Sequence, residues 1–400
     1  MTTDDVPGDR TREGVPLYTP PPGTPGAGAM YPRVVRLDYD EWESKGEREG
    51  DSETLLATFE HYRSADEEYA PQPYFPIYRS TDGGESWSQF AEIHDTQNDW
   101  GLRYQPVLFE LPEPIGPWPA GTVLAAGNSI PADRSRTKID VYASEDHGRT
   151  WSFVSTVATG GRAAPGVGAT PVWEPEFALD ADGNLVCYFA DERHSEKGYD
   201  QCIGHRVSHD GGRTWDEQVL DVAIPNSEDR PGMPIVTTLP DGRYAMVYEI
   251  VGPTYDGGVF IETSPDGTSW GDPAVIGSPV RTADGHQLTN GPYVAWTPAG
   301  GDDGTVLVSG KTLRDRDGGR ASGSGRTLLA TTDFEDFGSW TPVSAPLWFD
   351  DELVVEQRTV GWTTPLLPTR DGSELLQLTS TFVDEGRCEI RYASGALELE

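Results

Sequence analysis

A short motif that recurs along the chain is the feature that most restricts how it can fold. The pattern Ser-x-Asp-x-Gly-x-x-Trp occurs as STDGGESW (80–87), SEDHGRTW (144–151) and SHDGGRTW (208–215). A copy one residue shorter, SPDGTSW, occupies 264–270, and TTDFEDFGSW (331–340) is a longer, degenerate fifth copy. The spacing between copies suits one propeller blade, which consists of four short strands and their connections.

Each copy has the chemistry of a tight β-hairpin. The Asp accepts hydrogen bonds from N–H groups of the turn, the Gly supplies positive φ, and the Trp packs across the hairpin. We therefore assign these Asp residues to structure and not to catalysis. The motif resembles the Asp-box (BNR), or sialidase-type, repeat, which occurs on six- and seven-bladed β-propellers.

The number of blades follows from two further columns of residues. A proline followed by apolar or β-branched residues recurs six times, as Pro32, Pro106, Pro175, Pro234, Pro292 and Pro365, and we expect each to open an innermost strand. Second strands follow, ending at or beside Glu60, Asn128, Asp191, Glu249, Lys311 and Ser380. We predict an all-β fold, a sialidase-like six-bladed β-propeller over residues 31–400, preceded by an extended arm (1–30). The last blade has no Asp box, so residues 15–18 of the arm are expected to supply its outer strand and close the ring.

Strand direction places these columns in the ring. Because successive strands in a blade are antiparallel, the proline column and the ends of the second strands share one face, opposite the Asp-box hairpins. The residues before the six prolines are Tyr31, Gln105, Glu174, Met233, Gly291 and Thr364, of which only Glu174 carries a carboxyl group. Glu249 ends the second strand of the neighbouring blade on the same face. Such a pair of carboxylates is what glycoside hydrolysis requires, and Glu60 is the competitor for either role.

Composition narrows the partners. The formal net charge of −36 repels nucleic acid and anionic membrane surfaces, which favours a neutral or cationic partner. Three cysteines are too few for a disulfide framework, and the common zinc and phosphate-loop motifs do not occur. We expect no cofactor, no metal and a monomer. Neither a signal peptide nor an apolar run of membrane-spanning length is present, so we expect a cytoplasmic protein; secretion is the alternative if the chain is truncated.

Five longer strings carry a more specific signal: LRYQPVLFELP (102–112), PAGTVLAAGNSIP (119–131), TPVWEPEF (170–177), DRPGMPIV (229–236) and GRYAMVYE (242–249). They resemble the corresponding segments of glycoside hydrolase family 93, the exo-acting α-L-1,5-arabinanases on a six-bladed propeller. The resemblance runs from about residue 31 through the fourth blade and more weakly to the C-terminus.

The resemblance implies a retaining mechanism on a neutral, arabinan-like saccharide, with Glu174 as nucleophile and Glu249 as acid/base. The two carboxyl groups of a retaining enzyme lie about 5–5.5 Å apart. We expect Glu174 to stay ionised and the pKa of Glu249 to be raised. Candidate residues for contacting the substrate are His61, Tyr104, Gln105, Asn128, Trp173, Asp191, Arg193, Arg230 and Asn290.

Two alternatives remain open. A sialidase binds the carboxylate of its substrate with three arginines, one of which precedes the proline of an innermost strand. Here YPRV places Arg33 after the proline, and Arg103, Arg230 and Arg358 are the other arginines that could form such a cluster. A non-catalytic propeller that binds a glycan or protein is the alternative from another class, because fold does not fix function. A structure in which Glu174 and Glu249 each form a salt bridge, with no open pocket, would favour that second alternative.

Overall fold

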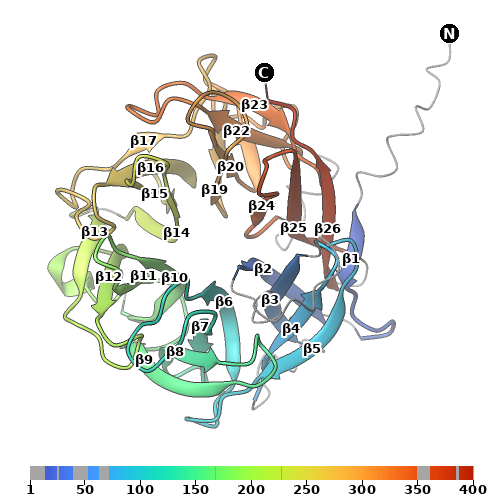
Figure 1. Cartoon of the computed structure of the whole chain (residues 1–400). Helices are drawn as coiled ribbons and strands as arrows, with labels where there is room; N and C mark the ends of the chain where they lie inside the picture. The colour runs from blue at the N-terminus through green and yellow to red at the C-terminus, as the bar shows by residue number, and fades with distance from the viewer. Residues whose placement is uncertain are drawn as a thin grey trace.

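Six β-sheets are arranged around a common axis (Figure 1). The structure is a computed structural model and describes residues 14–24, 27–38, 53–62, 72–166, 168–226, 228–348, 361–383 and 387–399. Each innermost strand contacts the innermost strands of both neighbouring blades, so the ring is closed. The six-bladed β-propeller predicted from the repeats is confirmed.

The first three blades are regular four-stranded sheets. Blade one consists of β2 (Gly28–Leu37), β3 (Thr54–Tyr62), β4 (Phe75–Ser80) and β5 (Ser88–Ile93). Blade two consists of β6 (Leu102–Glu110), β7 (Val123–Ser129), β8 (Thr137–Ser144) and β9 (Ser152–Gly160). Blade three consists of β10 (Val172–Leu179), β11 (Leu185–Asp191), β12 (Cys202–Ser208) and β13 (Val219–Ala223), with the short 3-10 helix η3 (Ser195–Lys197) before β12.

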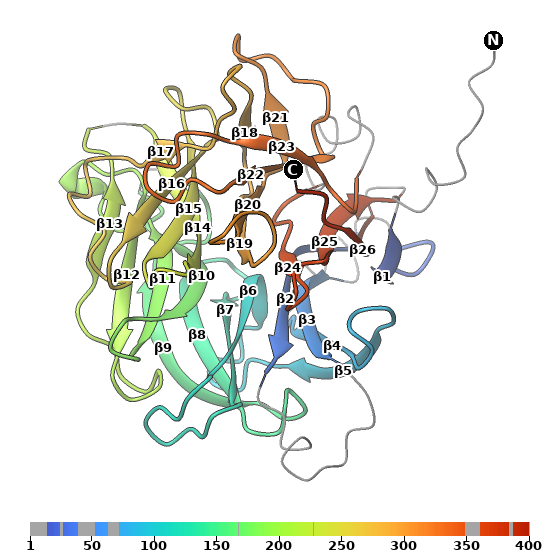
Figure 2. The ribbon, with the colours of Figure 1, turned by 45° about the horizontal axis from the view of Figure 1, so that its top comes forward.

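The other three blades depart from this plan. Blade four consists of β14 (Arg230–Thr238), β15 (Tyr244–Val251), β16 (Gly258–Ser264), β17 (Ser278–Pro279) and β18 (Gln287–Thr289), extended by β21 (Thr312–Arg314) from the next blade. Figure 2 shows β18 and β21 side by side at the edge of the ring. Blade five consists of β19 (Tyr293–Thr297), β20 (Thr305–Ser309), β22 (Thr327–Thr331) and β23 (Thr341–Ser344). Blade six consists of β24 (Leu366–Pro368), β25 (Glu374–Phe382), β26 (Cys388–Ala396) and β1 (Val15–Tyr18).

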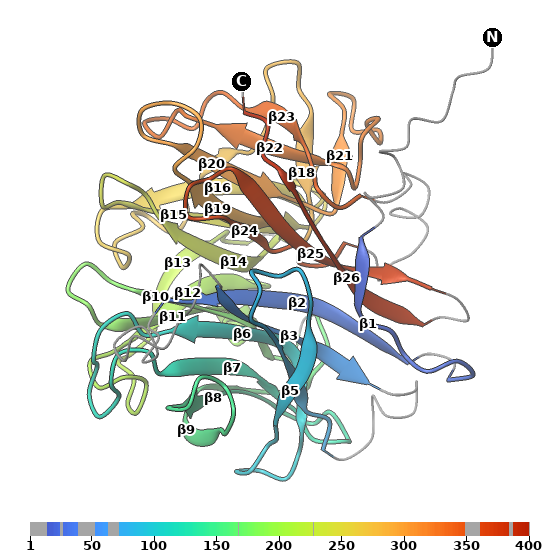
Figure 3. The same ribbon diagram turned by 45° about the vertical axis from the view of Figure 1, so that its right-hand side comes forward.

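The N-terminal strand completes the last blade. β1 pairs antiparallel with β26, in the position of the outer strand that the sequence analysis expected (Figure 3). Leu17 is only 7% exposed and belongs to a hydrophobic cluster shared by blades six and one. The N-terminal segment therefore joins the two ends of the chain and covers the edge of β26.

The Asp boxes form the predicted hairpin turns. In the first copy the Ser80 hydroxyl donates to Asp82 (2.6 Å) and accepts the N–H of Gly84 (2.9 Å). Asp82 also accepts the N–H of Ser86 (3.0 Å), and the Trp87 indole donates to the carbonyl of Gly84 (3.2 Å). The second copy repeats all of these bonds. These carboxylates hold the turns, as predicted.

The prediction that each proline opens an innermost strand is wrong for blades one to four. Those strands begin three or four residues before the proline and carry a β-bulge at the residue before it, where the register with the second strand shifts. The residue before the proline has positive φ in five blades: Tyr31 (51°), Gln105 (54°), Glu174 (59°), Met233 (54°) and Gly291 (53°). A bulge leaves one residue out of the ladder, which tolerates a proline without an N–H and re-aims the preceding side chain.

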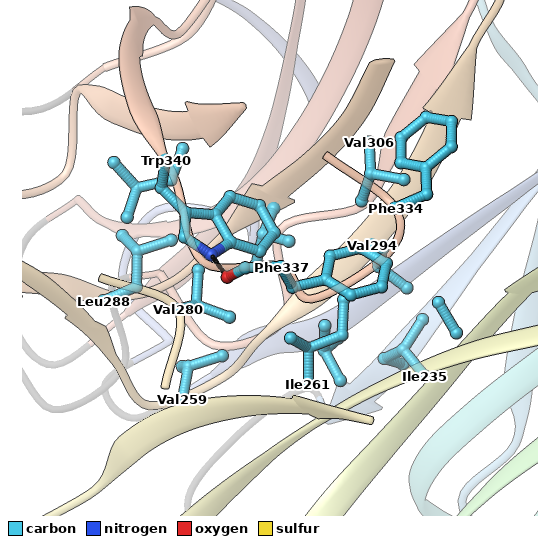
Figure 4. Close-up of a cluster of buried hydrophobic side chains, with 14 of the residues drawn as sticks. Ile235, Val259, Ile261, Val280, Leu288, Val294, Val306, Phe334, Phe337 and Trp340 are labelled. Carbon is cyan, nitrogen blue, oxygen red and sulfur yellow. Dashed lines mark hydrogen bonds between the residues drawn. The ribbon is translucent and has the colours of Figure 1, made fainter. Parts of the chain in front are cut away.

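Hydrophobic side chains fill the spaces between adjacent blades. Figure 4 shows one such cluster, in which Trp340 and Phe337 of the fifth Asp box pack near Val259 and Ile261 of β16. The Trp340 indole also donates to the carbonyl of Phe337 (2.9 Å). Asp-box tryptophans thus join the blades and fix the innermost strands that carry the candidate site.

Candidate active site

Two carboxyl groups flank one short stretch of backbone at the axial edge of blade four. Glu249 on β15 is the register partner of Gly232 on β14. Glu174, from blade three, accepts the N–H of Met233 at its Oε2 (2.6 Å). The sequence prediction that Glu174 and Glu249 share a face is therefore matched by the geometry, and that face lies opposite the Asp-box hairpins.

Neutral donors surround each carboxylate. Glu249 Oε2 accepts the N–H of Gly291 (2.8 Å) and the side-chain amide of Asn290 (3.3 Å). Glu174 Oε1 accepts the side-chain amide of Gln105 (3.3 Å), and the N–H of Glu174 donates to Gln105 Oε1 (3.1 Å). Among the described residues neither Glu174 nor Glu249 forms a salt bridge, which removes the observation that would have favoured a binding scaffold.

The pKa values of the pair differ from those expected from the sequence, where only the pKa of Glu249 was predicted to be raised and Glu174 was predicted to stay ionised. Burial raises the pKa of Glu174 to about 8, and the neighbouring charge of Glu249 contributes further. Burial also raises the pKa of Glu249 to about 7, opposed by the hydrogen bond from Gly291. Burial is the first cause of both raised pKa values, and the charge of Glu249 adds to it at Glu174, so the pair holds a single proton between the two values.

The bulges connect the site residues from blade to blade. At the bulges of blades two, three and four the N–H donates to a side chain of the preceding blade: Gln105 donates to Glu60 Oε1 (3.0 Å), Glu174 to Gln105 and Met233 to Glu174. Glu60 is 1% exposed and is the register partner of Met30. In blade one Glu60 therefore occupies the position that Glu249 occupies in blade four, where its register partner is Gly232. Glu60, the competitor for a catalytic role, therefore holds the residue that holds Glu174. Non-glycine residues at positive φ cost about 1–3 kcal/mol each, so the rest of the ring must stabilise this arrangement.

A second group of polar residues lies beside Glu174. Glu192 accepts the Trp173 indole N–H (2.9 Å) and both terminal nitrogens of Arg230 (2.6 and 3.2 Å). Arg230 also donates to Gln201 (2.6 Å). The charge of Arg230 acts on Glu174 and opposes the rise of its pKa. Sequence reasoning proposed Trp173 and Arg230 but missed Glu192 and Gln201, since neither falls in the columns that define the blades.

An aromatic pair also lies near the acids and was missed. The rings of Tyr31 and Trp362 stack with centroids 6.0 Å apart and an interplanar angle of 19°. Burial raises the pKa of Tyr31 well above its usual range, and the charges of Glu60, Glu174 and Glu249 raise it further. Tyr31 directly precedes Pro32 in the proline column of blade one, and this position was the signal that could have identified it.

Several predicted substrate contacts lie elsewhere in the structure. Asn128 and Asp191 are fully buried, so neither side chain is available to a ligand as it stands. Asn128 donates to the carbonyl of Val172 (2.8 Å), and Asp191 binds Arg193 (2.6 Å). Arg193 extends from there to Gln218, just before β13, the outer strand of blade three (2.8 Å). Asp191 was predicted to hold the position in blade three that Glu249 holds in blade four. That position belongs to Ala190, the register partner of Trp173, so the prediction is wrong by one residue.

His61 and Tyr104 make aromatic contacts. His61 is 9% exposed and lies among Tyr18, Phe59 and Tyr74, with a ring nitrogen 3.0 Å from the Tyr18 hydroxyl, so it packs against the N-terminal strand. Tyr104 lies beside Trp173, with ring centroids 6.3 Å apart. Of the nine predicted contact residues, the structure brings Gln105 and Asn290 to the carboxylates directly, and Arg230, Trp173 and Tyr104 to the neighbouring group.

The arginines expected of a sialidase have other partners. Arg33 forms a buried salt bridge with Glu176 (2.9 Å), and Arg103 donates to the carbonyl of Ile130 (2.8 Å). Arg230 is paired with Glu192 (2.6 Å), and Arg358 lies outside the described residues. In the described part of the chain no cluster of three or more His, Cys, Asp or Glu side chains is suited to a metal ion. Nor does that part contain a helix with the length and hydrophobicity needed to span a membrane.

Comparison with known proteins identifies the family. A BNR repeat-like domain matches residues 53–296. An α-L-arabinanase of Penicillium chrysogenum, solved with arabinobiose, is 35% identical with a TM-score of 0.79, and the match covers 96% of this chain and 98% of that chain. The family 93 α-L-arabinofuranosidase of Fusarium graminearum, also solved with arabinobiose, is 31% identical with a TM-score of 0.79, over 96% and 97% of the two chains.

The chain belongs to glycoside hydrolase family 93. The Fusarium graminearum enzyme has also been solved with an iminosugar inhibitor, at 32% identity and a TM-score of 0.79 over 96% of this chain and 98% of that chain. No curated protein sequence matches the chain. Membership of family 93 makes the protein a glycoside hydrolase, and the resemblance noted from its sequence strings is confirmed.

Proposed function

We propose that this family 93 enzyme is a retaining, exo-acting α-L-1,5-arabinanase with Glu174 as nucleophile and Glu249 as acid/base. The observation that carries the proposal is the pair of electrostatically coupled carboxyl groups flanking residues 232–233, without salt bridges among the described residues. Two acids of raised pKa that hold one proton between them provide both the charged and the protonated group that the chemistry needs.

The proposed reaction has two steps. The Glu174 carboxylate attacks the anomeric carbon while Glu249 gives its proton to the departing glycosidic oxygen, which forms a glycosyl ester and releases the rest of the saccharide. Glu249, now ionised, then takes a proton from water, whose oxygen attacks the same carbon and frees Glu174. Two inversions retain the configuration at that carbon.

The proposed roles require the shared proton to lie on Glu249 when substrate is bound. The Met233 N–H and the Gln105 amide donate to Glu174, and Arg230 adds positive charge nearby; these contacts stabilise its ionised form, but its pKa of about 8 stays above the value of about 7 for Glu249. Attack by Glu174 therefore requires the proton to move to Glu249, which is 6% exposed, when substrate binds. Arabinan as substrate is supported by the arabinobiose complexes of the Penicillium chrysogenum and Fusarium graminearum relatives.

The test is a product analysis on linear 1,5-arabinan. A single short oligosaccharide from the first minutes of reaction is expected of exo action, whereas a ladder of lengths contradicts it. Proton NMR of the first product shows whether the anomeric configuration is retained, and an inverted product contradicts the assignment of Glu174 as nucleophile. Cleavage of a sialoside in place of arabinan would contradict the substrate class.

A further inference from the structure

Glu192 is a buried carboxylate that the proposed reaction does not use. It is 2% exposed and accepts four hydrogen bonds: from the N–H of Gly166 (2.8 Å), the Trp173 indole (2.9 Å) and two nitrogens of Arg230 (2.6 and 3.2 Å). Glu192 directly follows β11, the second strand of blade three, and Arg230 is the first residue of β14. Charged groups are rarely buried without partners, and here the partner is a single guanidinium.

Arg230 is hydrogen-bonded to Glu192 and to Gln201 and still has N–H donors without a partner among the described residues. Its Nη2 donates to both Glu192 and Gln201 (2.6 Å each), and Gln201 is in turn fixed by its bond to the carbonyl of Pro231 (2.8 Å). Of its five N–H bonds, those on Nε and one on Nη1 have no partner among the described residues. The side chain is 18% exposed, so a ligand can reach it.

This group adjoins the proposed nucleophile. A Cβ atom placed on Gly232 would lie 2.5 Å from Gln201 Nε2 and 3.0 Å from Glu174 Oε2, so both side chains come close to Gly232. Arg230 and Glu192 act on the charge of Glu174 in opposite senses, Arg230 favouring ionisation and Glu192 opposing it. Glu249, and Glu60 through Gln105, are the other acids near Glu174.

We propose that Glu192 is a positioning residue that holds Arg230 beside Glu174 and neutralises its charge, so that the site selects neutral sugars over sugar acids. The spare Arg230 hydrogens donate to a sugar hydroxyl. A carboxylate gains little from a guanidinium that is already paired with a buried anion, because the second anion is repelled by the first. The inference rests on the proposed function and adds the basis of its selectivity.

The experiment compares the binding of L-arabinose and L-arabinonate by titration calorimetry to wild type and to Glu192→Gln. This substitution keeps the shape of the side chain and removes its charge, so Arg230 becomes an uncompensated cation. We expect the dissociation constant for arabinonate to fall about tenfold, as a charge-assisted contact requires, with less than a twofold change for arabinose. The limb of the kcat/KM profile near pH 8, which follows the pKa of Glu174, should also move to lower pH, because Glu174 then lies near an unopposed positive charge.

Two further variants complete the test. Glu196→Gln removes the same charge from an exposed position in η3 and should change neither ratio nor pH profile. Gln201→Glu adds a carboxylate beside Arg230 and should weaken arabinonate binding several-fold, which provides an answer even if Glu192→Gln fails to fold. An unchanged arabinonate-to-arabinose ratio in either buried variant overturns the positioning role. Absence of arabinan cleavage alongside a shifted ratio overturns only the proposed substrate, because the binding measurement needs no turnover.

Discussion

Gly232 lies where the two proposed catalytic acids meet, so its replacement by alanine tests the site without touching either of them. Its φ lies outside the left-handed region, so the backbone accepts a side chain. The new Cβ would be 2.5 Å from Gln201 Nε2 and 3.0 Å from Glu174 Oε2, whereas ordinary contact begins at 3.4 Å. Gln201 must therefore retreat by about 0.9 Å and Glu174 by about 0.4 Å.

These displacements set the expected magnitudes. Moving Gln201 strains its bonds to Pro231 and Arg230, at a cost of about 1–3 kcal/mol in the free energy of unfolding, partly offset by about 0.4–1 kcal/mol from the less flexible unfolded chain. Misplacing a nucleophile by a fraction of an ångström to 1 Å lowers kcat by up to about 10²-fold. The variant is thus expected to fold and to turn over slowly.

Initial rates on an arabinofuranoside and thermal unfolding curves provide the two readouts. Gly395→Ala is the matched control, because Gly395 also lies in a strand, β26, and its closest Cβ contact would be an ordinary 3.4 Å. A Gly232→Ala enzyme whose kcat stays within about threefold of wild type would refute the placement of both acids around this residue.

Four further predictions concern the acids and the ring closure. Glu249→Gln should lower kcat by about 10²–10⁴-fold on arabinan but much less on an aryl glycoside, whose leaving group needs no proton; equal losses on both would argue against its role as acid. Because the pair must hold one proton, kcat/KM should fall below pH 7 and above pH 8, following the pKa values of about 7 for Glu249 and about 8 for Glu174, and a flat profile across that window would contradict the coupling. The same raised pKa values mean that the folded protein binds protons that the unfolded chain has lost, so the stability that these groups contribute declines as pH rises from their ordinary value of 4.5 through 7–8, and Glu174→Gln should raise the melting temperature more at pH 9 than at pH 5. Leu17→Ala should cost about 2–3 kcal/mol in a denaturant titration, whereas Val15→Ala, at a position 54% exposed, should cost little; equal effects would show that β1 contributes no packing.

Some of the site could be predicted from the sequence because aligning the repeats shows which residues occupy equivalent positions in successive blades. Once the proline column was aligned, Glu174 stood out as its only acid, and Glu249 followed from the antiparallel order of strands. The same counting failed for Asp191, because the second strand of blade three was taken to end at its polar residue, whereas Ala190 is the register partner of Trp173, as Glu249 is of Gly232. A shift of one residue turns a side chain to the other face of a strand, so Asp191 does not share the face of Glu249.

The sequence by itself determined the blade count, the position of the hairpins and the two acids, since each depends on a local pattern repeated at a regular interval. The tertiary structure alone decided that Glu192 neutralises Arg230, that Glu60 holds Gln105, and that both acids of the pair have raised pKa values. These properties arise between residues of different blades, and electrostatic interactions depend on distance and burial in space rather than on separation along the chain.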